Sequence, residues 1–221
     1  MSIAIVGAGG HGRVALECLE LSCGIADEVV FYDDRWEHLG AVDGVPVFGP
    51  VESLASDARF ERVFVGIGDN RARRRISLLL ERGGKTFLTI RHPKTTISPR
   101  AVIGEGTITV AGTVVNRDAR VGRDVILNTV CSIGHDCVVD DYAQVSPGVN
   151  LGGACVVGEG AFLGVGVKVV PEARIGAWSI VGAGSVVLGD LPERSLCVGA
   201  PAKVVRPLRE DELPELGGSA G

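Results

Sequence analysis

A strict period of six residues runs through the second half of the chain. Stepping by six from Ile97, every position except Thr109 is aliphatic. These positions, called here the aliphatic column, are Ile97, Ile103, Thr109, Val115, Val121, Leu127, Ile133, Val139, Val145, Leu151, Val157, Leu163, Val169, Ile175, Val181 and Val187. An α-helix repeats every 3.6 residues and a half-exposed strand every two, so neither explains a period of six.

A second column and a set of glycines accompany the aliphatic column. Four residues after each aliphatic position, the side chain is small or β-branched: Ala101, Thr107, Thr113, Ala119, Val125, Cys131, Cys137, Ala143, Val149, Cys155, Ala161, Val167, Ala173, Ser179 and Ser185. Glycine directly follows the aliphatic position at 104, 122, 134, 152, 158, 164, 176 and 182. We expect each hexad to form one flat side of a triangular coil of 18 residues, with stacked coils paired at about 4.8 Å. Both columns should fill the interior, and the glycines should make the bends at the corners.

The segment CSIGHDCVVD at 131–140 contains two cysteines, a histidine and an aspartate, which are residue types that bind metals. However, Cys131, Cys137 and Cys155 fall in the small inward column, so we interpret them as buried spacers. No metal site is predicted. His135 follows Ile133 by two residues, lies in neither column and is expected to face outward.

The first ninety residues alternate between strand and helix patterns. An apolar strand at 3–6 leads into GAGGHG at 7–12 and an amphipathic stretch at 14–21, while strands at 28–32 and 62–67 end in Asp33-Asp34 and Gly68. This order predicts a small parallel sheet whose ligand lies at the carboxyl ends of the strands, with backbone N–H groups offered to phosphate. About 95 residues are too few for both halves of a dinucleotide fold, so we expect one nucleotide moiety rather than NAD.

Two questions about this segment stay open. The glycines of GAGGHG either bind phosphate or form only a tight structural turn, and His11 either faces a ligand or merely begins the helix. His38 and His92 lie in loop patterns and are expected on the surface.

Composition and charge exclude several classes of protein. The chain has 221 residues and a formal net charge of −5, and it has no long basic run, so nucleic acid and membrane surfaces are not expected partners. No segment has the roughly 18 consecutive apolar residues of a membrane span, and the N-terminus does not read as a signal peptide. Six cysteines without a CxxC pair favour a reduced, cytoplasmic protein.

Several motifs together resemble one family over nearly the whole chain: GAGGHG, DD after the second strand, GIGDN, NTVCSIGHDCVVDDY within the repeat, and the closing VGAPAKVVR. They resemble the sialic-acid O-acetyltransferase-like family of hexapeptide-repeat acyltransferases, and most closely the N-acetyltransferases of nucleotide-linked 4-amino-4,6-dideoxy sugars of the bacillosamine and perosamine pathways. The resemblance implies a Rossmann-like α/β domain at 1–92 and a left-handed parallel β-helix with its cap at 93–208, followed by a flexible tail at 209–221. It also implies a homotrimer that uses acetyl-CoA and a nucleotide sugar.

The resemblance assigns roles to individual residues. It implies that His135 is the general base and that Asp136 orients it. The implied nucleotide-sugar residues are Gly9, Gly10, His11, Asp33, Asp34 and Gly68. The implied acetyl-CoA residues are Gln144, Gly153, Val165 and Ala183, with Gln144 standing where bacillosamine-type enzymes have a second histidine. In this scheme an amine attacks the thioester directly, and a backbone N–H, that of Gly153, stabilises the oxyanion.

Three alternatives compete with this interpretation. A sugar O-acetyltransferase would have the same motifs, because a hydroxyl can replace the amine. A non-catalytic trimer that binds nucleotide sugars would keep the shape without turnover. The γ-type carbonic anhydrases share the coil but bind zinc through three histidines, and residues 97–190 contain only His135.

Overall fold

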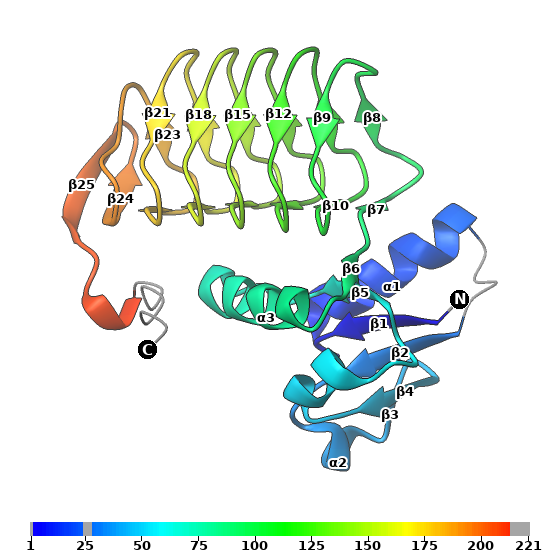
Figure 1. The fold of residues 1–221 in the computed structure, drawn as a ribbon. Helices are drawn as coiled ribbons and strands as arrows, with labels where there is room; N and C mark the ends of the chain where they lie inside the picture. The colour runs from blue at the N-terminus through cyan, green and yellow to red at the C-terminus, as the bar shows by residue number, and fades with distance from the viewer. Residues whose placement is uncertain (1, 24–27, 213–221) are drawn as a thin grey trace.

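The computed structural model describes residues 2–23 and 28–212, which form an α/β domain followed by a long triangular coil (Figure 1). The coil is a left-handed parallel β-helix: the period of six predicts its triangular turns, and the family resemblance implies its hand. Among the described helices, none is long and apolar enough to cross a membrane.

Three parallel sheets form the faces of the coil, and strands one coil apart pair with each other. The first face consists of β7 (Ile90–Arg91), β10 (Ile108–Thr109), β13 (Ile126–Leu127), β16 (Gln144–Val145), β19 (Phe162–Leu163) and β22 (Ile180–Val181). The second face consists of β8 (Thr96–Ile97), β11 (Val114–Val115), β14 (Ser132–Ile133), β17 (Asn150–Leu151), β20 (Lys168–Val169) and β23 (Val186–Val187). The third face consists of β9 (Val102–Ile103), β12 (Arg120–Val121), β15 (Val138–Val139), β18 (Val156–Val157) and β21 (Arg174–Ile175).

The two predicted columns form the interior of the coil. From Val115 to Val187 every member of the aliphatic column is buried, and the small column is buried from Thr107 to Ser185. Cys131, Cys137 and Cys155 are fully buried, so the interpretation of these cysteines as interior spacers is confirmed. The coil begins at β7, slightly before residue 93, because Ile90 already pairs with Ile108.

The expected role of the column glycines was wrong. The bends with left-handed backbone lie three residues after the aliphatic column, in an unbroken series: Gly106, Gly112, Asp118, Asp124, Val130, Asp136, Tyr142, Gly148, Ala154, Gly160, Gly166, Glu172, Trp178 and Gly184. The column glycines instead allow close approach of the next coil. A Cβ atom at Gly134 would lie 2.4 Å from the carbonyl oxygen of Gly152, which is backbone and cannot move aside.

The N-terminal domain is a twisted sheet with the strand order β3-β4-β2-β1-β5-β6. Its strands are β1 (Ile3–Val6), β2 (Val29–Tyr32), β3 (Ala41–Val42), β4 (Val45–Phe48), β5 (Arg62–Val65) and β6 (Thr86–Phe87). Its helices are α1 (Gly10–Cys23), α2 (Trp36–Leu39), the 3₁₀ helix η1 (Val51–Ser56) and α3 (Asn70–Arg82). All pairs are parallel except β3 with β4, so the carboxyl ends of β1, β2 and β5 meet at one edge.

The first face of the coil packs against this domain. Its outward residues Ile90, Ile108 and Ile126 share a buried cluster with Ala15 and Leu16 of α1. The helix α3 covers the corner between the third and first faces, where Arg123 pairs with Glu81 at 2.7 Å. The N-terminal domain therefore occupies one side of the triangle.

The two histidines expected on the surface differ in their exposure. His38 is exposed as expected. His92 is buried in the turn after β7, where its Nδ1 accepts the backbone N–H of Lys94 at 3.0 Å, so the expectation for His92 was wrong.

The coil ends in a hairpin of β24 (Ser195–Gly199) and β25 (Ala202–Pro207), followed by the 3₁₀ turn η2 (Glu210–Glu212). Glu212 accepts hydrogen bonds from Arg206 and from the backbone of Arg209, so the expected tail is tied down as far as residue 212. Residues 213–221 lie outside the described part.

Candidate functional site

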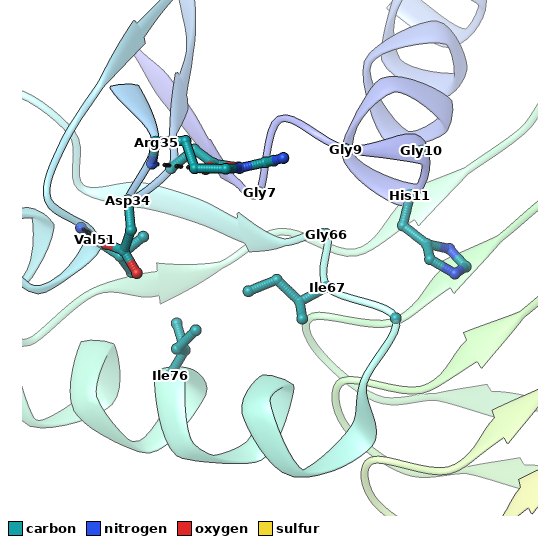
Figure 2. A pocket seen from close by; sticks show the side chains of 12 residues that line it. Gly7, Gly9, Gly10, His11, Asp34, Arg35, Val51, Gly66, Ile67 and Ile76 are labelled. Carbon is teal, nitrogen blue, oxygen red and sulfur yellow. Dashed lines mark hydrogen bonds and ion pairs between the residues drawn. The ribbon is translucent and has the colours of Figure 1, made fainter. Parts of the chain in front are cut away.

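A pocket of about 430 Å³ opens at the carboxyl ends of β1, β2 and β5 (Figure 2). Its lining consists of Gly7, Gly9, Gly10, His11, Asp33, Asp34, Arg35, Val51, Gly66, Ile67, Gly68 and Ile76. All six residues predicted to bind the nucleotide sugar are in this lining. The pocket is therefore where the strand order predicts a ligand site.

The glycines at the pocket divide into two groups. Gly12 and Gly66 permit close packing, since a Cβ atom at Gly12 would lie 1.8 Å from the carbonyl oxygen of Gly7. A Cβ atom added at Gly9 or Gly10 would meet no atom within 4 Å, so their backbone is open to the pocket. Because α1 begins at Gly10, free N–H groups and the positive end of the helix dipole lie at the pocket wall. The glycines of GAGGHG therefore have two roles. Gly12 is needed for packing, whereas the backbone at Gly9 and Gly10 is available to an anion.

Asp33 orders one wall of the pocket. One carboxylate oxygen accepts the N–H of Ala8 at 3.0 Å, and both oxygens accept Arg35 side-chain donors at 2.9 and 3.0 Å. These Arg35 hydrogen bonds, opposed by partial burial, lower the pKa of Asp33 to about 2. Asp33 thus holds Arg35 at the pocket, and both of its carboxylate oxygens already accept hydrogen bonds from the protein.

The opposite wall is largely apolar. Val51, Ile67 and Ile76 line it, and Asp34 accepts the backbone N–H of Val51 at 2.9 Å with one carboxylate oxygen. The other oxygen of Asp34 accepts no hydrogen bond from the described residues, and Asp34 is exposed. An apolar wall beside an open carboxylate oxygen suits a flat heterocycle that carries N–H donors.

His11 lies at the end of the pocket nearer the coil (Figure 2). Its ring covers Gly68, where an added Cβ atom would lie 2.6 Å from the ring carbon Cδ2. Burial, together with the charge of Arg73, lowers the pKa of His11. His11 is therefore both the second residue of α1 and a pocket residue, and it is neutral near pH 7.

His135 and Asp136 form a hydrogen-bonded pair on a different part of the molecule. The distance between Nδ1 of His135 and Oδ2 of Asp136 is 2.7 Å, and the side chains are 68% and 62% exposed. A carboxylate only accepts, so Nδ1–H donates and Nε2 keeps its lone pair. The ring lies over Gly153, where an added Cβ atom would be 2.4 Å from Nε2.

The structure brings only some of the predicted acetyl-CoA residues together. Gly153 lies beside His135 at the corner between the second and third faces. Val165 and Ala183 follow β19 and β22 at the corner between the first and second faces. Gln144 is 6% exposed on the first face, and its Oε1 has no partner among the described residues. Binding of acetyl-CoA by these residues stays a prediction.

Within one chain, the pocket and the His135 pair are separated. The N-terminal domain covers the first face, whereas His135 lies between β14 and β15, at the corner opposite that face. The pocket and His135 therefore lie on different sides of one chain.

Sequence reasoning missed two cations, Arg35 and Arg73. Arg35 directly follows the Asp33-Asp34 pair, which is a usable signal, but nothing in the sequence separates Arg73 from its arginine neighbours in α3. In the part of the chain that the structure describes, no group of three His, Cys, Asp or Glu residues is placed to hold a metal ion.

Comparison with known proteins agrees with both halves of the fold. Residues 2–78 match the PglD N-terminal domain, and residues 154–189 match the bacterial transferase hexapeptide repeats. The chain is 37% identical over 114 residues to UDP-N-acetylbacillosamine N-acetyltransferase of Bacillus subtilis, an alignment covering 50% of this chain and 51% of that protein. The curated relatives are matched over 51% to 66% of their own lengths.

Two solved structures are similar over most of the chain. PerB from Caulobacter crescentus, in complex with CoA and GDP-perosamine, is 38% identical with a TM-score of 0.85, covering 92% of this chain and 97% of that one. The acetyltransferase domain of PglB from Neisseria gonorrhoeae, in complex with acetyl coenzyme A, is 35% identical with a TM-score of 0.87, covering 92% and 98%. The chain therefore belongs to the hexapeptide-repeat acyltransferases with a PglD-type N-terminal domain, the family of the perosamine and bacillosamine N-acetyltransferases.

Proposed function

We propose that this protein is an acetyl-CoA-dependent N-acetyltransferase that acetylates the 4-amino group of a nucleotide-linked 4-amino-4,6-dideoxy sugar. The observation that carries the proposal is the His135–Asp136 pair, which leaves Nε2 of an exposed histidine free beside a glycine backbone. The names of the relatives support the substrates, because they include N-acetyltransferases and complexes with CoA and a nucleotide sugar.

In the proposed mechanism, Nε2 of His135 acts as the general base. The amine attacks the thioester carbonyl, and Nε2 takes its proton as the C–N bond forms. The hydrogen bond to Asp136 stabilises the resulting imidazolium. When the tetrahedral intermediate collapses, the C–S bond breaks and the imidazolium returns the proton to the CoA sulfur. The Gly153 N–H is the proposed donor to the oxyanion.

The nucleotide sugar is proposed to bind in the pocket of the N-terminal domain. The open backbone at Gly9 and Gly10, the start of α1 and Arg35 supply donors and positive charge for a diphosphate. The apolar wall with Asp34 is proposed to hold the base. We also propose the cytoplasm as the location, since the described cysteines other than Cys23 are free and buried.

We propose a homotrimer because the pocket and His135 lie on opposite sides of one chain. Lys94 lies in the first turn of the corner between the first and second faces, but from β10 onward the turns of this corner carry no charged side chain. These later turns, called here the uncharged corner, consist of Ala111, Gly112, Thr129, Val130, Pro147, Gly148, Val165, Gly166, Ala183 and Gly184. Val130 and Val165 are 62% and 57% exposed there. The other two corners carry charges such as Arg117 and Glu159. An uncharged edge with exposed valines suits contact with a second copy.

A thiol-release assay tests the proposed activity. Acetyl-CoA is supplied with UDP- and GDP-linked 4-amino-4,6-dideoxyhexoses, with the 4-hydroxy analogues and with sialic acid, and the product is identified by mass spectrometry. We expect CoA release with an amino sugar and formation of an alkali-stable amide. An ester product would establish an O-acetyltransferase instead. Binding of the nucleotide sugar without release of CoA in the presence of any acceptor would favour the non-catalytic trimer.

A further inference from the structure

One arginine in α3 is buried at the junction of the two domains. Arg73 is 1% exposed, whereas the neighbouring arginines Arg71 and Arg74 are partly exposed and Arg75 is exposed. Its Nη1 donates to the carbonyl oxygens of Ile67 at 2.8 Å and Gly68 at 3.5 Å. Burial lowers its pKa to about 10, so the guanidinium remains charged at neutral pH. A buried guanidinium is tolerated only where its N–H donors are hydrogen-bonded.

The other nitrogens of Arg73 bind the coil. Nε donates to the carbonyl oxygen of Asp124 at 2.8 Å, and Nη2 donates to that of Tyr142 at 2.7 Å. These carbonyl groups belong to two successive coils at the corner between the third and first faces. One planar group therefore joins the wall of the pocket to two coils.

Asn70 completes the junction. Its Oδ1 accepts from Nη2 of Arg73 at 2.8 Å, and its Nδ2 donates to the carbonyl oxygen of Gly160 at 3.0 Å, one coil further on. Every acceptor of Arg73 is thus a neutral oxygen. A guanidinium that served only as an ion-pair partner would contact carboxylates, whereas this one is arranged to hold backbone segments in place.

The segment that Arg73 holds lies directly against the pocket. Ile67 and Gly68 line the pocket, and the His11 ring packs on Gly68. A shift of the Gly68 carbonyl group would move both this wall and the ring of His11. Arg73 itself is not in the pocket lining, so it acts through these residues.

We propose that Arg73 is a positioning residue that fixes the Ile67–Gly68 wall of the pocket, and with it His11, relative to the coil. The wider consequence rests on the proposed function: a nucleotide sugar in the pocket is then presented at a constant position relative to the partner subunit's general base.

Three variants test the proposal. Arg73→Met removes all donors, and Arg73→Lys keeps the charge but lacks the planar fork that reaches both sides. Arg74→Met is the matched control, because Arg74 also joins α3 to the coil, through a partly exposed pair with Glu159 at 3.2 Å, without contacting the pocket wall.

The first measurement needs no ligand. Titration of the histidine ring protons by NMR should give a higher pKa for His11 in Arg73→Met than in wild type, since a nearby positive charge is lost. Hydrogen exchange of the amides at 66–69 should accelerate at least tenfold in both Arg73 variants and stay within twofold of wild type in Arg74→Met. Unchanged His11 titration and unchanged exchange at 66–69 in a folded Arg73→Met variant would overturn the proposal.

The second measurement is kinetic, with the best nucleotide sugar from the thiol-release assay. We expect the KM for the nucleotide sugar to rise tenfold or more in both Arg73 variants, with the KM for acetyl-CoA unchanged. A purely structural role would lower the active fraction, and hence kcat, with both KM values unchanged, which would contradict positioning. If wild type releases no CoA with any acceptor, the proposed function fails, and the NMR and exchange results still decide the role of Arg73.

Discussion

At His135, the corner of the coil presents an exposed ring whose orientation is set by one neighbour. His135→Ala removes the proposed base from a solvent-facing position, so we expect kcat to fall by roughly 10² to 10⁴ while the fold persists. Asp136→Asn should cost less, because an amide still accepts from Nδ1–H. Steady-state kinetics alongside thermal melts check both variants, and near-wild-type turnover of His135→Ala would exclude it as the base.

Gly153 has no room for a side chain beneath the His135 ring. In Gly153→Ala the new methyl group would lie 2.4 Å from Nε2, and the exposed ring can swing aside. We therefore expect a small change in melting temperature but a fall in kcat of about tenfold or more, because the base leaves its position. Gly189→Ala serves as the control, since Gly189 does not have a left-handed backbone and a Cβ atom added there would meet nothing within 4 Å. Equal kcat in Gly153→Ala and wild type would contradict this placement of the base.

At the scale of the elements, the interior columns of the coil set the tolerance for side-chain volume. Cys137 occupies the small column, where alanine serves in other coils, so Cys137→Ala should lose roughly 0.5 to 1.5 kcal/mol. Cys137→Leu should overpack the coil and cost on the order of 1 to 3 kcal/mol. Denaturant melts compare the two. If Cys137→Leu leaves the free energy of unfolding unchanged, the assignment of Cys137 to the small column is contradicted. If Cys137→Ala is folded but inactive, the thiol takes part in the reaction.

The contact between α3 and the coil buries a carboxyl group. Burial, opposed mainly by the charge of Arg123, raises the pKa of Asp124 to about 6, compared with about 3.9 in an unfolded chain. The folded state thus binds this proton more tightly, and its contribution to stability is present below pH 4 and is lost as pH rises through 6.

Asp124→Asn removes this titration and keeps a residue type that tolerates the left-handed backbone at φ 52°. Relative to wild type, we expect it to gain on the order of 1 to 3 kcal/mol between pH 4 and pH 7. Urea melts at both pH values measure the difference. A difference between the two proteins that is independent of pH would show that Asp124 does not titrate in this range.

At the scale of the whole molecule, assembly is predicted to complete the site. Val130 has a left-handed backbone at φ 56°, which is unfavourable for a β-branched residue, on the uncharged corner where Gly112 and Gly148 occupy the equivalent positions. Val130→Asp suits that backbone but charges the corner, so we expect the trimer to dissociate without loss of fold. Light scattering with circular dichroism tests this, with Val102→Asp on the third face as the control. A Val130→Asp trimer would argue against contact at this corner.

Mixing two inactive chains tests whether copies share a site. Arg35→Glu weakens the pocket of one chain, and His135→Ala removes the base of the other. After joint unfolding and refolding of equal amounts, we expect about a quarter of wild-type activity, because a site then needs one intact contribution from each of two copies. Mixtures as inactive as either parent would place the pocket and the base of each site in the same chain.

The sequence by itself determined the coil and six of the residues that line the pocket. A period of six repeated without a slip has one economical solution, a stack of triangular coils, and this assigns every column residue to the interior. The pocket residues follow from the rule that parallel strands present their carboxyl ends at one edge, which brings Gly9, Asp34 and Gly68 together. The period of six and the succession of strands and helices along the chain are local properties, so they can be read from the sequence.

Only the tertiary structure decided which residues serve at contacts between segments distant in the sequence. Arg73 and Arg74 are adjacent arginines in one helix, yet one is buried at the domain junction and the other is partly exposed. The column glycines are required by the neighbouring coil rather than by their own bend, and the separation of His135 from the pocket depends on which face the N-terminal domain covers. Such outcomes depend on backbone that is distant in the sequence, 69 residues away in the bond from Arg73 to Tyr142, and no local pattern records them.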